Sequence, residues 1–547
     1  MARTFPEFGY NPVTGDWNDS LSGEFLWSNV NVSEAVPDVM TPSTWSLWWI
    51  HHYEANLFEF PGDYCFCGNI CGRPYLNLSL IFSVYRAIGK DVRNELQADA
   101  IGSAPMEFGI PTIRFSAYQV LRTMLPGLLR AQAQASRDQK TTSEFLATTP
   151  GWCHSTRKTI QESLDSHNLL SLWQAEIKPN VFRACQMLRS VTMNMADPAT
   201  KLRQHLAALV GEADANAILS NLSGAAADLE SLGPLLGLAK VRDGQMSGAE
   251  YLERYGHRGP HEMELSAPGA EDDPAWLEKR LAEFNRSKVD IDGLLENQRA
   301  EALVAWQRFE TRFPKKVKAT HQALDKVSAA ARSREAVRSE VTRLTRLVRT
   351  YLLQAGTLTG VGDDVFFLSL DELTKILTGD KTSISYIPPR RVAYERYCAL
   401  PPYPAMIIGH FDPFAWAADP KRRSDFFALN QPASTPLACT IHGYAGSAGV
   451  VEGTVRKLDR PEDGDQLQIG EILVAVTTNV GWTPLFPRSA AVVTDVGAPL
   501  SHAAIVAREL GIPAVVGCGN ATMLLKTGDR VRVDGGSGTV DVIERVG

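Results

Sequence analysis

The sequence has no excess of basic residues: 62 acidic residues outnumber 55 lysines and arginines, which gives a net charge of −7. The basic face typical of nucleic-acid-binding proteins is therefore not expected. Long apolar runs are missing as well. The runs at 45–50 and 472–476 are far shorter than the roughly 18 residues of a membrane span, and residues 1–8 lack the apolar core of a secretory signal. We therefore expect a cytoplasmic protein that binds neither nucleic acid nor membrane.

Cysteine is scarce, with eight residues in a chain of 547, which is too few for a disulfide scaffold. Cys65, Cys67 and Cys71 follow His51 and His52, and this spacing allows a zinc site. Structural zinc sites normally combine two C-x₂₋₄-C pairs, and no second pair occurs. We therefore favour small buried side chains over a metal centre and expect no bound metal.

The residue pattern predicts a multidomain chain with three parts. Residues 1–397 are expected to form a mostly helical α+β body. Seven prolines between 398 and 440 break any periodicity, so this segment is predicted to be a linker or a wrapping segment. Residues 441–547 are predicted to form a compact α/β domain, with strands at 450–458, 471–476, 490–494, 514–516, 530–533 and 539–543.

The helical pattern is clearest near residue 340. Apolar side chains recur at steps of three and four and so line one helix face, with Gly356 as the expected stop; they are Val337, Val341, Leu344, Val348 and Leu352. Five arginines lie on the opposite face: Arg334, Arg338, Arg343, Arg346 and Arg349. One interpretation is a phosphate-binding strip. The interspersed glutamates favour a solvent-exposed helix face instead.

The most informative segment runs from 490 to 517. A buried strand ends at Thr494, a Gly/Pro loop follows, and Ser501 is a good helix N-cap. His502 then occupies the first helical position, where unpaired N–H groups and the helix dipole favour a neutral imidazole and a bound anion. This placement suits transient phosphorylation of a ring nitrogen. The hydroxyls of Thr494 and Ser501 are expected to bind the phosphoryl oxygens.

The run Ser501-His-Ala-Ala-Ile-Val-Ala-Arg-Glu-Leu-Gly-Ile-Pro-Ala-Val-Val-Gly517, with Thr494 seven residues before it, resembles the swivelling phosphohistidine domain of the phosphoenolpyruvate-utilising enzymes. The resemblance implies that His502 is the phosphorylated residue. It also implies that domain 441–547 swings on linker 398–440. Upstream, the segments 29–42, 255–262 and 402–409 resemble the acceptor-binding domain of rifampin phosphotransferase-like members, so that residues 1–397 are expected to bind the acceptor.

The segment 255–262 supplies further candidates on the grounds of this resemblance. Arg258 is expected to bind the phosphoryl group, and Glu262 either holds Arg258 or accepts the acceptor's proton. His257 and His261 are rival bases, and the alternative for Arg258 and Glu262 is a structural ion pair. The aromatic residues Trp45, Trp48 and Trp49 either line an apolar acceptor pocket or form a core, which is the commoner role of such residues.

Members of this family commonly begin with an ATP-grasp domain, and no G-x₄-G-K-[ST] motif is present here. We therefore expect a separate ATP-grasp subunit that binds ATP and Mg²⁺, as in phenylphosphate synthase-like systems. The expected function is an ATP-dependent phosphotransferase, of the dikinase type, that acts on a phenol or aryl alcohol and gives an aryl phosphate, AMP and phosphate. Two alternatives remain: a rifamycin-type antibiotic phosphotransferase with a split ATP-binding subunit, and a non-catalytic phosphocarrier module.

Overall fold

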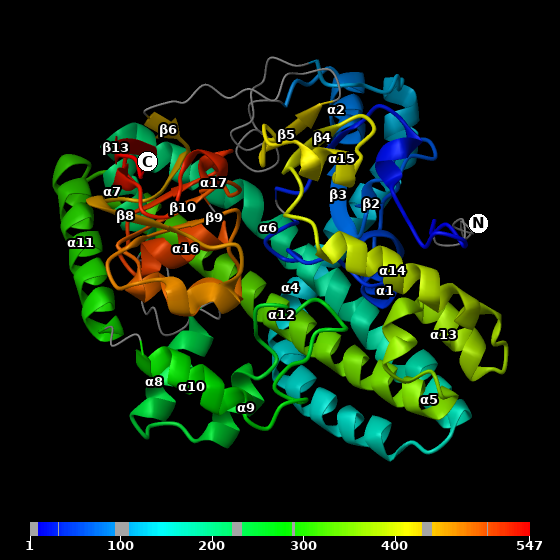
Figure 1. Ribbon diagram of the computed structural model, residues 1–547. Helices are drawn as coiled ribbons and strands as arrows, with labels where there is room; N and C mark the ends of the chain where they lie inside the picture. Colours follow the sequence, from blue (N-terminus) through cyan, green and yellow to red (C-terminus); the bar gives the residue numbers. More distant parts are fainter. Residues whose placement is uncertain are drawn as a thin grey trace.

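The computed structural model describes residues 9–30, 32–92, 109–220, 232–286, 290–428, 440–499 and 501–546. Long helices cross the molecule. In the view of Figure 1, a small sheet lies at the upper right, and a larger sheet forms the C-terminal domain at the left. This arrangement agrees with the predicted multidomain α+β architecture. None of the described helices is long and apolar enough to span a bilayer.

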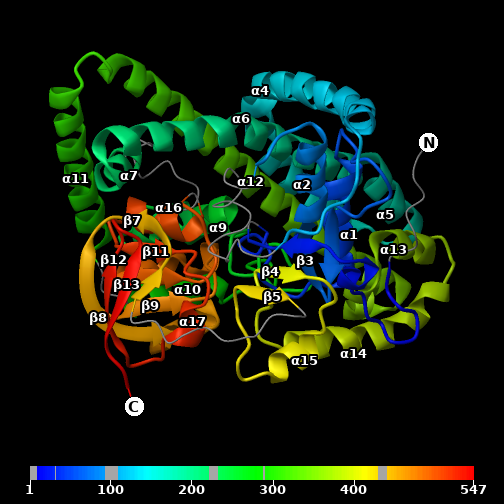
Figure 2. The ribbon, with the colours of Figure 1, turned by 90° about the horizontal axis from the view of Figure 1, so that it is seen from above.

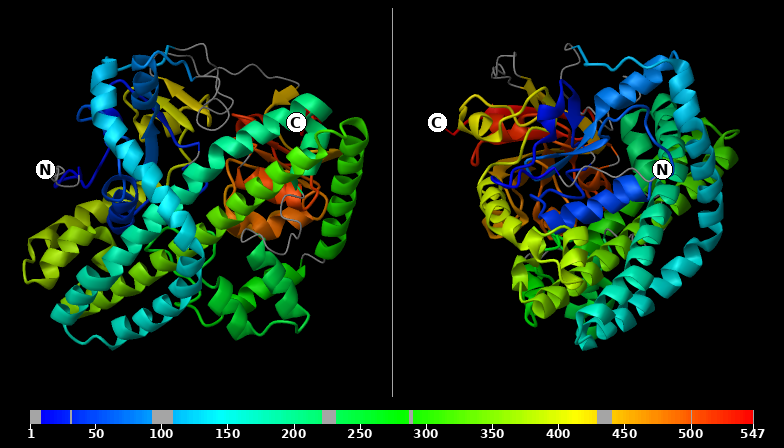
Figure 3. Two further views of the ribbon diagram at one scale, coloured as in Figure 1. Left: turned by 180° about the vertical axis from the view of Figure 1, so that it is seen from behind. Right: turned by 90° about the vertical axis from the view of Figure 1, so that its right-hand side faces the viewer.

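Three long helices form the centre of the body: α4 (Ala117–Glu162), α6 (Lys178–Val210) and α12 (Val317–Thr359). They pack against one another along much of their length (Figure 3). The predicted apolar face of α12 is buried, which confirms it. The helix continues to Thr359 and ends at Gly360, whose φ of +75° suits glycine, rather than at the predicted Gly356.

The prediction of a solvent-exposed arginine face on α12 is wrong. Arg346 and Arg349 are buried and pair with Asp272. Arg334 and Arg338 are partly buried, with 25% and 22% of their side chains exposed. Because the body wraps around α12 on several sides, both faces of the helix meet protein.

Shorter elements surround these helices. They are η1 (Asp19–Ser22), α1 (Pro42–Trp49), η2 (Ile50–Glu54), α2 (Leu78–Ala87), α5 (Ser166–Leu172), η4 (Trp173–Ile177), α7 (Glu212–Ser220), α8 (Gly233–Arg242), α9 (Gly248–Tyr255), α10 (Trp276–Arg286), α11 (Ile291–Arg312), η6 (Gly362–Phe367), α13 (Leu370–Leu377), η7 (Thr382–Tyr386) and α14 (Ile387–Cys398). Helices α7 and α11 flank the C-terminal domain on one side (Figure 2).

The small sheet joins both ends of the body in the order β2-β3-β1-β4-β5. Its strands are β1 (Leu26–Ser28), β2 (Cys67–Ile70), β3 (Arg73–Asn77), β4 (Met406–Ile408) and β5 (Phe426–Ala428), with α15 (Pro413–Ala418) between the last two. Within the segment 398–440, residues 406–428 are therefore part of the small sheet rather than a free tether, because β4 pairs with β1 and β5 pairs with β4. Residues 429–439 lie outside the described part of the chain.

The C-terminal domain contains an eight-stranded sheet with the order β6-β13-β12-β8-β9-β10-β11-β7. All six predicted strands are present: β8 (Val450–Lys457), β9 (Ile472–Ala475), β10 (Ala491–Thr494), β11 (Ala514–Val516), β12 (Arg530–Asp534) and β13 (Thr539–Glu544). The edge strands β6 (Thr440–His442) and β7 (Tyr444–Ser447) were not predicted, and η8 (Pro461–Gln466), η9 (Val480–Arg488), α16 (His502–Glu509) and α17 (Ala521–Leu524) complete the domain.

The cysteine cluster is part of the packed body. Cys67 and Cys71 are buried, and the Cys65 thiol lies 2.9 Å from the Tyr53 hydroxyl. Burial raises the pKa of Cys65 to about 12, so the thiol stays protonated. Within the described ranges, no three His, Cys, Asp or Glu side chains are grouped to hold a metal ion.

Candidate functional site

His502 stands at the first position of α16, as predicted. The strand β10 ends at Thr494, and Ser501 caps the helix by accepting a hydrogen bond from the Ala504 N–H. The side chains of Ala503, Val506 and others on this helix pack into the domain core. The local sequence therefore determines the position of His502 in the domain. The residues that surround its ring come from other parts of the chain.

Two threonine hydroxyls contact the His502 ring. Thr478 Oγ1 lies 3.2 Å from Nδ1, and Thr483 Oγ1 lies 3.3 Å from Nε2. A neutral imidazole has one donor and one acceptor nitrogen, so one hydroxyl donates to the ring and the other accepts from it. Neither threonine was predicted. The topology would have indicated them. Thr478 and Thr483 follow β9, and the residues that follow two parallel neighbouring strands, such as β9 and β10, lie at the same edge of the sheet.

The imidazole of His502 is uncharged at neutral pH. Burial lowers its pKa to about 3, and the positive charge of Arg338 acts in the same direction. The neutral ring keeps a lone pair on one nitrogen, which is the form that attacks phosphorus.

Glu34 reaches the start of α16 from the body. Its Oε2 accepts a hydrogen bond from the His502 backbone N–H at 3.1 Å, a position at which a helix favours negative charge. Burial raises the pKa of Glu34 to about 7, although this hydrogen bond and the charges of Arg338 and Arg334 oppose the shift. Glu34 is therefore able to exchange a proton near neutral pH.

Arg334 and Arg338 project from one face of α12, because residues four apart lie one above the other. Arg334 pairs with Glu335 at 2.6 Å, and the nearest carboxylate of Arg338 among the described residues is Glu262 at 3.8 Å. Burial alone would raise the pKa of Glu335, but the charges of Arg334, Arg338 and Arg258 and the hydrogen bond from Arg334 outweigh it and lower the pKa to about 2. Guanidinium groups match phosphoryl oxygens well, so this pair is a phosphate-binding candidate that the sequence interpretation had set aside.

Arg258 and Glu262 form a buried ion pair in the loop after α9. Arg258 Nε donates to Glu262 Oε2 at 2.8 Å. Glu262 also accepts a hydrogen bond from the Gly259 N–H and lies near Arg338, so it orients two arginines. The charge of Arg258 contributes to the low pKa of His502, which places the guanidinium within electrostatic range of the ring. The predicted holding role of Glu262 fits this geometry better than the predicted base role.

Within the described part of the chain, the other predicted polar residues form no hydrogen bond with the His502 imidazole. His257 Nε2 is 2.9 Å from Ser339 Oγ, and burial lowers the pKa of His257 well below its usual value. The hydroxyls of Thr494 and Ser501 flank Gly497, where a Cβ would stand 3.3 and 3.1 Å from them. Ser501 is the helix cap, and Thr494 Oγ1 has no hydrogen-bond partner among the described residues. Contact between these hydroxyls and a phosphoryl group stays a prediction.

A cavity of about 480 Å³ lies in the body next to this cluster, within the usual size range of small-molecule sites. Arg334 and Arg338 line it, and so does Ala35, which follows Glu34. The residues that surround His502 therefore also border the cavity. Most of the wall is apolar and includes Leu47, Phe58, Phe66, Val181 and Met263.

The three candidate tryptophans take different places. Trp48 lines the cavity and stacks on His52, with ring centroids 4.7 Å apart. Trp45 is buried in the core against Trp17, and Trp49 stacks on Tyr53. Only Trp48 is thus placed to contact a molecule in the cavity.

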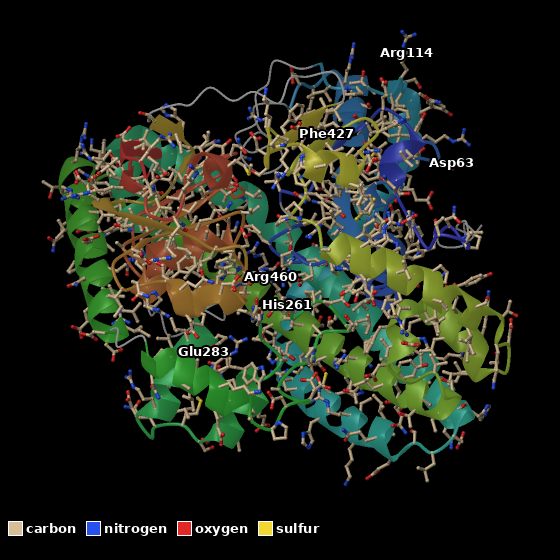
Figure 4. All side chains as sticks on the ribbon, viewed as in Figure 1. Asp63, Arg114, His261, Glu283, Phe427 and Arg460 are labelled. Atoms are coloured by element: carbon tan, nitrogen blue, oxygen red, sulfur yellow. The ribbon has the colours of Figure 1, made fainter. Side chains whose placement is uncertain are left out.

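The segment 260–261 docks the C-terminal domain onto the body. His261 Nδ1 is 2.9 Å from Asp38, and its Nε2 is 3.1 Å from Glu462 of the domain. These two hydrogen bonds raise the pKa of His261 to about 10, so the ring is a cation between two carboxylates. Asn479 Nδ2 donates to the Pro260 carbonyl at 2.8 Å. Figure 4 shows His261 where domain and body meet, so His261 is part of the interface rather than a base.

The interface between the C-terminal domain and the body also includes polar and apolar contacts outside residues 260–261. Ser424 of the body lies 2.9 Å from both Asp495 and Asn520 of the domain. Burial raises the pKa of Asp495 to about 7. One hydrophobic cluster contains residues from both sides, among them Leu235, Tyr251, Leu295, Trp482 and Ala504. The docked position is therefore stabilised by shared apolar burial as well as by hydrogen bonds.

We expect Gly481→Val to prevent correct docking. A Cβ at Gly481 would stand 2.4 Å from the Pro260 Cα, which is closer than real contacts allow. Transfer of a phosphoryl group from His502 to an acceptor should fall at least about tenfold, since a misplacement of about 1 Å has effects of this order or larger. Phosphorylation of His502 itself should persist. Single-turnover decay of the phosphohistidine measures this, with Gly536→Val as control, because a Cβ there meets only Asp534.

Residues 467–538 match the family described as PEP-utilising enzyme, mobile domain. This segment of the C-terminal domain is similar to that mobile domain. The match contains β9, β10 and α16 and so includes His502 and both threonines on its ring. It confirms the family resemblance that the sequence indicated.

The chain is also similar to several curated proteins. It is 31% identical to rifampicin phosphotransferase of Bacillus subtilis over 57% of this chain and 36% of that protein. It is 30% identical to the prodigiosin synthesizing transferase PigC of Serratia marcescens over 55% of this chain and 34% of that protein, and 34% identical to the uncharacterized protein Rv2047c of Mycobacterium tuberculosis over 54% and 31%. The matched region spans about a third of each relative.

Proposed function

We propose that the chain is the acceptor-binding and phosphocarrier part of an ATP-dependent phosphotransferase. His502 carries a phosphoryl group to the hydroxyl of a phenol or aryl alcohol in the 480 Å³ cavity. Overall, ATP, water and the acceptor give an aryl phosphate, AMP and phosphate. The main support is the surroundings of His502. Its backbone N–H donates to Glu34, its ring is within electrostatic range of Arg338, and Arg338 also lines the cavity.

In the acceptor half-reaction the hydroxyl oxygen attacks phosphorus, the O–P bond forms and the P–N bond to His502 breaks. The bond pair returns to the ring nitrogen. The other ring nitrogen keeps its proton, so the ring leaves as a neutral imidazole, the form that the low pKa of His502 favours. Arg338 and Arg334 stabilise the charge on the phosphoryl oxygens. Glu34 takes the proton of the hydroxyl, a role that its pKa of about 7 suits.

The role of Glu34 predicts a pH dependence. Since only the ionised carboxylate accepts a proton, transfer should accelerate as the pH rises from 6 to 8, with a midpoint near the pKa of about 7. Glu34→Gln should slow transfer about a hundredfold and remove the dependence. An aryl alcohol is the right acceptor for the rate measurement, because its hydroxyl does not titrate in this range. A pH profile that keeps its shape in Glu34→Gln would assign the base elsewhere.

The donor half-reaction is assigned to an ATP-grasp subunit that binds ATP and Mg²⁺. A nitrogen of His502 attacks the β-phosphorus, and the bond from that phosphorus to the AMP oxygen breaks. Water then attacks the γ-phosphorus and releases it as phosphate, so that one phosphoryl group stays on the ring. The mobile domain has to leave the body for this step, and it then uncovers the apolar residues of the docked interface. A donor subunit that covers those residues makes the movement less costly.

Reconstitution tests the whole proposal. The chain, the candidate ATP-grasp subunit, labelled ATP and Mg²⁺ are mixed with phenols, aryl alcohols and a rifamycin. AMP and an aryl phosphate are the expected products. A phosphorylated rifamycin with no aryl phosphate would identify an antibiotic phosphotransferase, which the rifampicin phosphotransferase relatives favour. Label on His502 with no acceptor product would identify a phosphocarrier module.

A further inference from the structure

Arg189 of α6 is a mostly buried arginine that borders the cavity and has no carboxylate partner among the described residues. Its Nη2 donates to the backbone carbonyl of His51, and its Nε has no hydrogen-bond partner in the described part of the chain. The ionisable groups that act on it are the thiols of Cys185 and Cys67. Thiols whose pKa is raised by burial stay neutral, so they do not balance the guanidinium charge.

The other two arginines of the cavity wall each have a carboxylate nearby. Arg334 has Glu335 and Arg338 has Glu262. The described residues that line the cavity include no Asp, Glu or Lys. Burial lowers the pKa of His51 to about 3, and the charge of Arg189 acts in the same direction. Among the described residues that line the cavity, Arg189 is thus the arginine with no carboxylate beside it, and a buried charge without a counter-ion is costly.

We propose that Arg189 binds a carboxylate of the acceptor, so that the substrate is a hydroxyaryl acid rather than a neutral phenol. The carboxylate pairs with the guanidinium beside His51, while the hydroxyl faces Arg338. This assignment of substrate class rests on the proposed phosphotransferase function. A guanidinium forms paired hydrogen bonds with a carboxylate, and an amino substituent would find no lining carboxylate among the described residues.

The size of the cavity agrees with such a molecule. Its volume of about 480 Å³ is roughly three times that of the ~150 Å³ apolar cavity that holds one benzene. One aromatic ring, a short side chain and a carboxylate fit this space. Trp48 and Phe66 line the cavity and supply aromatic surface for the ring.

Direct binding to the unphosphorylated chain tests the proposal without any donor. The probes are 3-(4-hydroxyphenyl)propanoate and its methyl ester, compared by calorimetry at pH 7.5. The acid should bind at least about tenfold more tightly than the ester, as expected for one charge-assisted hydrogen bond. Arg189→Gln should remove this preference, and Arg189→Lys should keep part of it. Arg130→Gln is the control, because Arg130 is exposed on α4 next to the cavity residue Ala131.

Equal binding of acid and ester, no binding of either probe at millimolar concentration, or an unchanged preference in Arg189→Gln would overturn the proposal. The thermal midpoint of each variant shows whether it is folded. The Arg189→Lys variant keeps the test decisive if Arg189→Gln unfolds. Because binding needs neither His502 nor ATP, failure here is distinct from failure of phosphoryl transfer, which formation of an aryl phosphate from a neutral phenol reports separately.

Discussion

We expect His502→Ala to abolish aryl phosphate formation and to leave no acid-labile phosphate on the chain. The variant lacks the ring nitrogen that forms the P–N bond, and no other residue of the site takes over a nucleophile's role. Loss of a covalent nucleophile costs a factor of about 10⁴ or more. Labelled ATP with the donor subunit, or chemical phosphorylation with phosphoramidate, gives the incorporated phosphate directly.

The matched control is His442→Ala in the same domain, because His442 is exposed and lies at a sheet edge far along the order from β10. It should retain full phosphorylation and transfer. Thermal midpoints of both variants show whether a loss comes from unfolding. Normal aryl phosphate formation by His502→Ala would rule out the carrier role.

Arg338→Gln separates the two half-reactions. The chain should accept phosphate on His502 as before, because the donor step takes place away from the body. Transfer to the acceptor should slow about 10²- to 10³-fold, the usual effect of removing one donor to a developing negative charge. Arg338 is the cation with the largest influence on the His502 ring, and it lines the cavity.

The control is Arg343→Gln on the same helix. Arg343 pairs with Glu340, donates to the Glu253 and Arg254 carbonyls and does not border the cavity. It should leave transfer within about twofold of the native rate. If Arg338→Gln instead lowers His502 phosphorylation and transfers normally, Arg338 belongs to the donor step.

The sequence was most informative where the chemistry is local. A strand, a Gly/Pro loop, the cap Ser501 and a small-residue helix fix the place of His502, and each of these features is encoded by neighbouring residues. The buried face of α12 followed from its period of 3.6 residues for the same reason.

The parts that were not predicted depend on contacts between distant residues. Glu34 meets the His502 N–H across 468 positions, and no local pattern encodes such a pair. The arginines of α12, Arg334 and Arg338 among them, are mixed with glutamates, a pattern that is typical of an exposed helix face. The same pattern occurs when the ion pairs are covered by protein, so the sequence does not distinguish the two cases. In the proline-rich segment 398–440, proline hides any periodicity, so the short strands β4 and β5 have no local signal. Their positions are set by the pairing of β4 with β1 and of β5 with β4.

The most direct test of the account is single-turnover transfer from the chain after phosphorylation of His502 by phosphoramidate. With an aryl acceptor added and no ATP present, phosphorus NMR should show the phosphohistidine signal replaced by an aryl phosphate signal. The rate should be independent of protein concentration, because His502 and the cavity belong to one molecule. The contradicting result is release of inorganic phosphate alone, at the same rate with and without a phenol or an aryl alcohol. It would mean that His502 does not transfer its phosphoryl group to a molecule in the cavity.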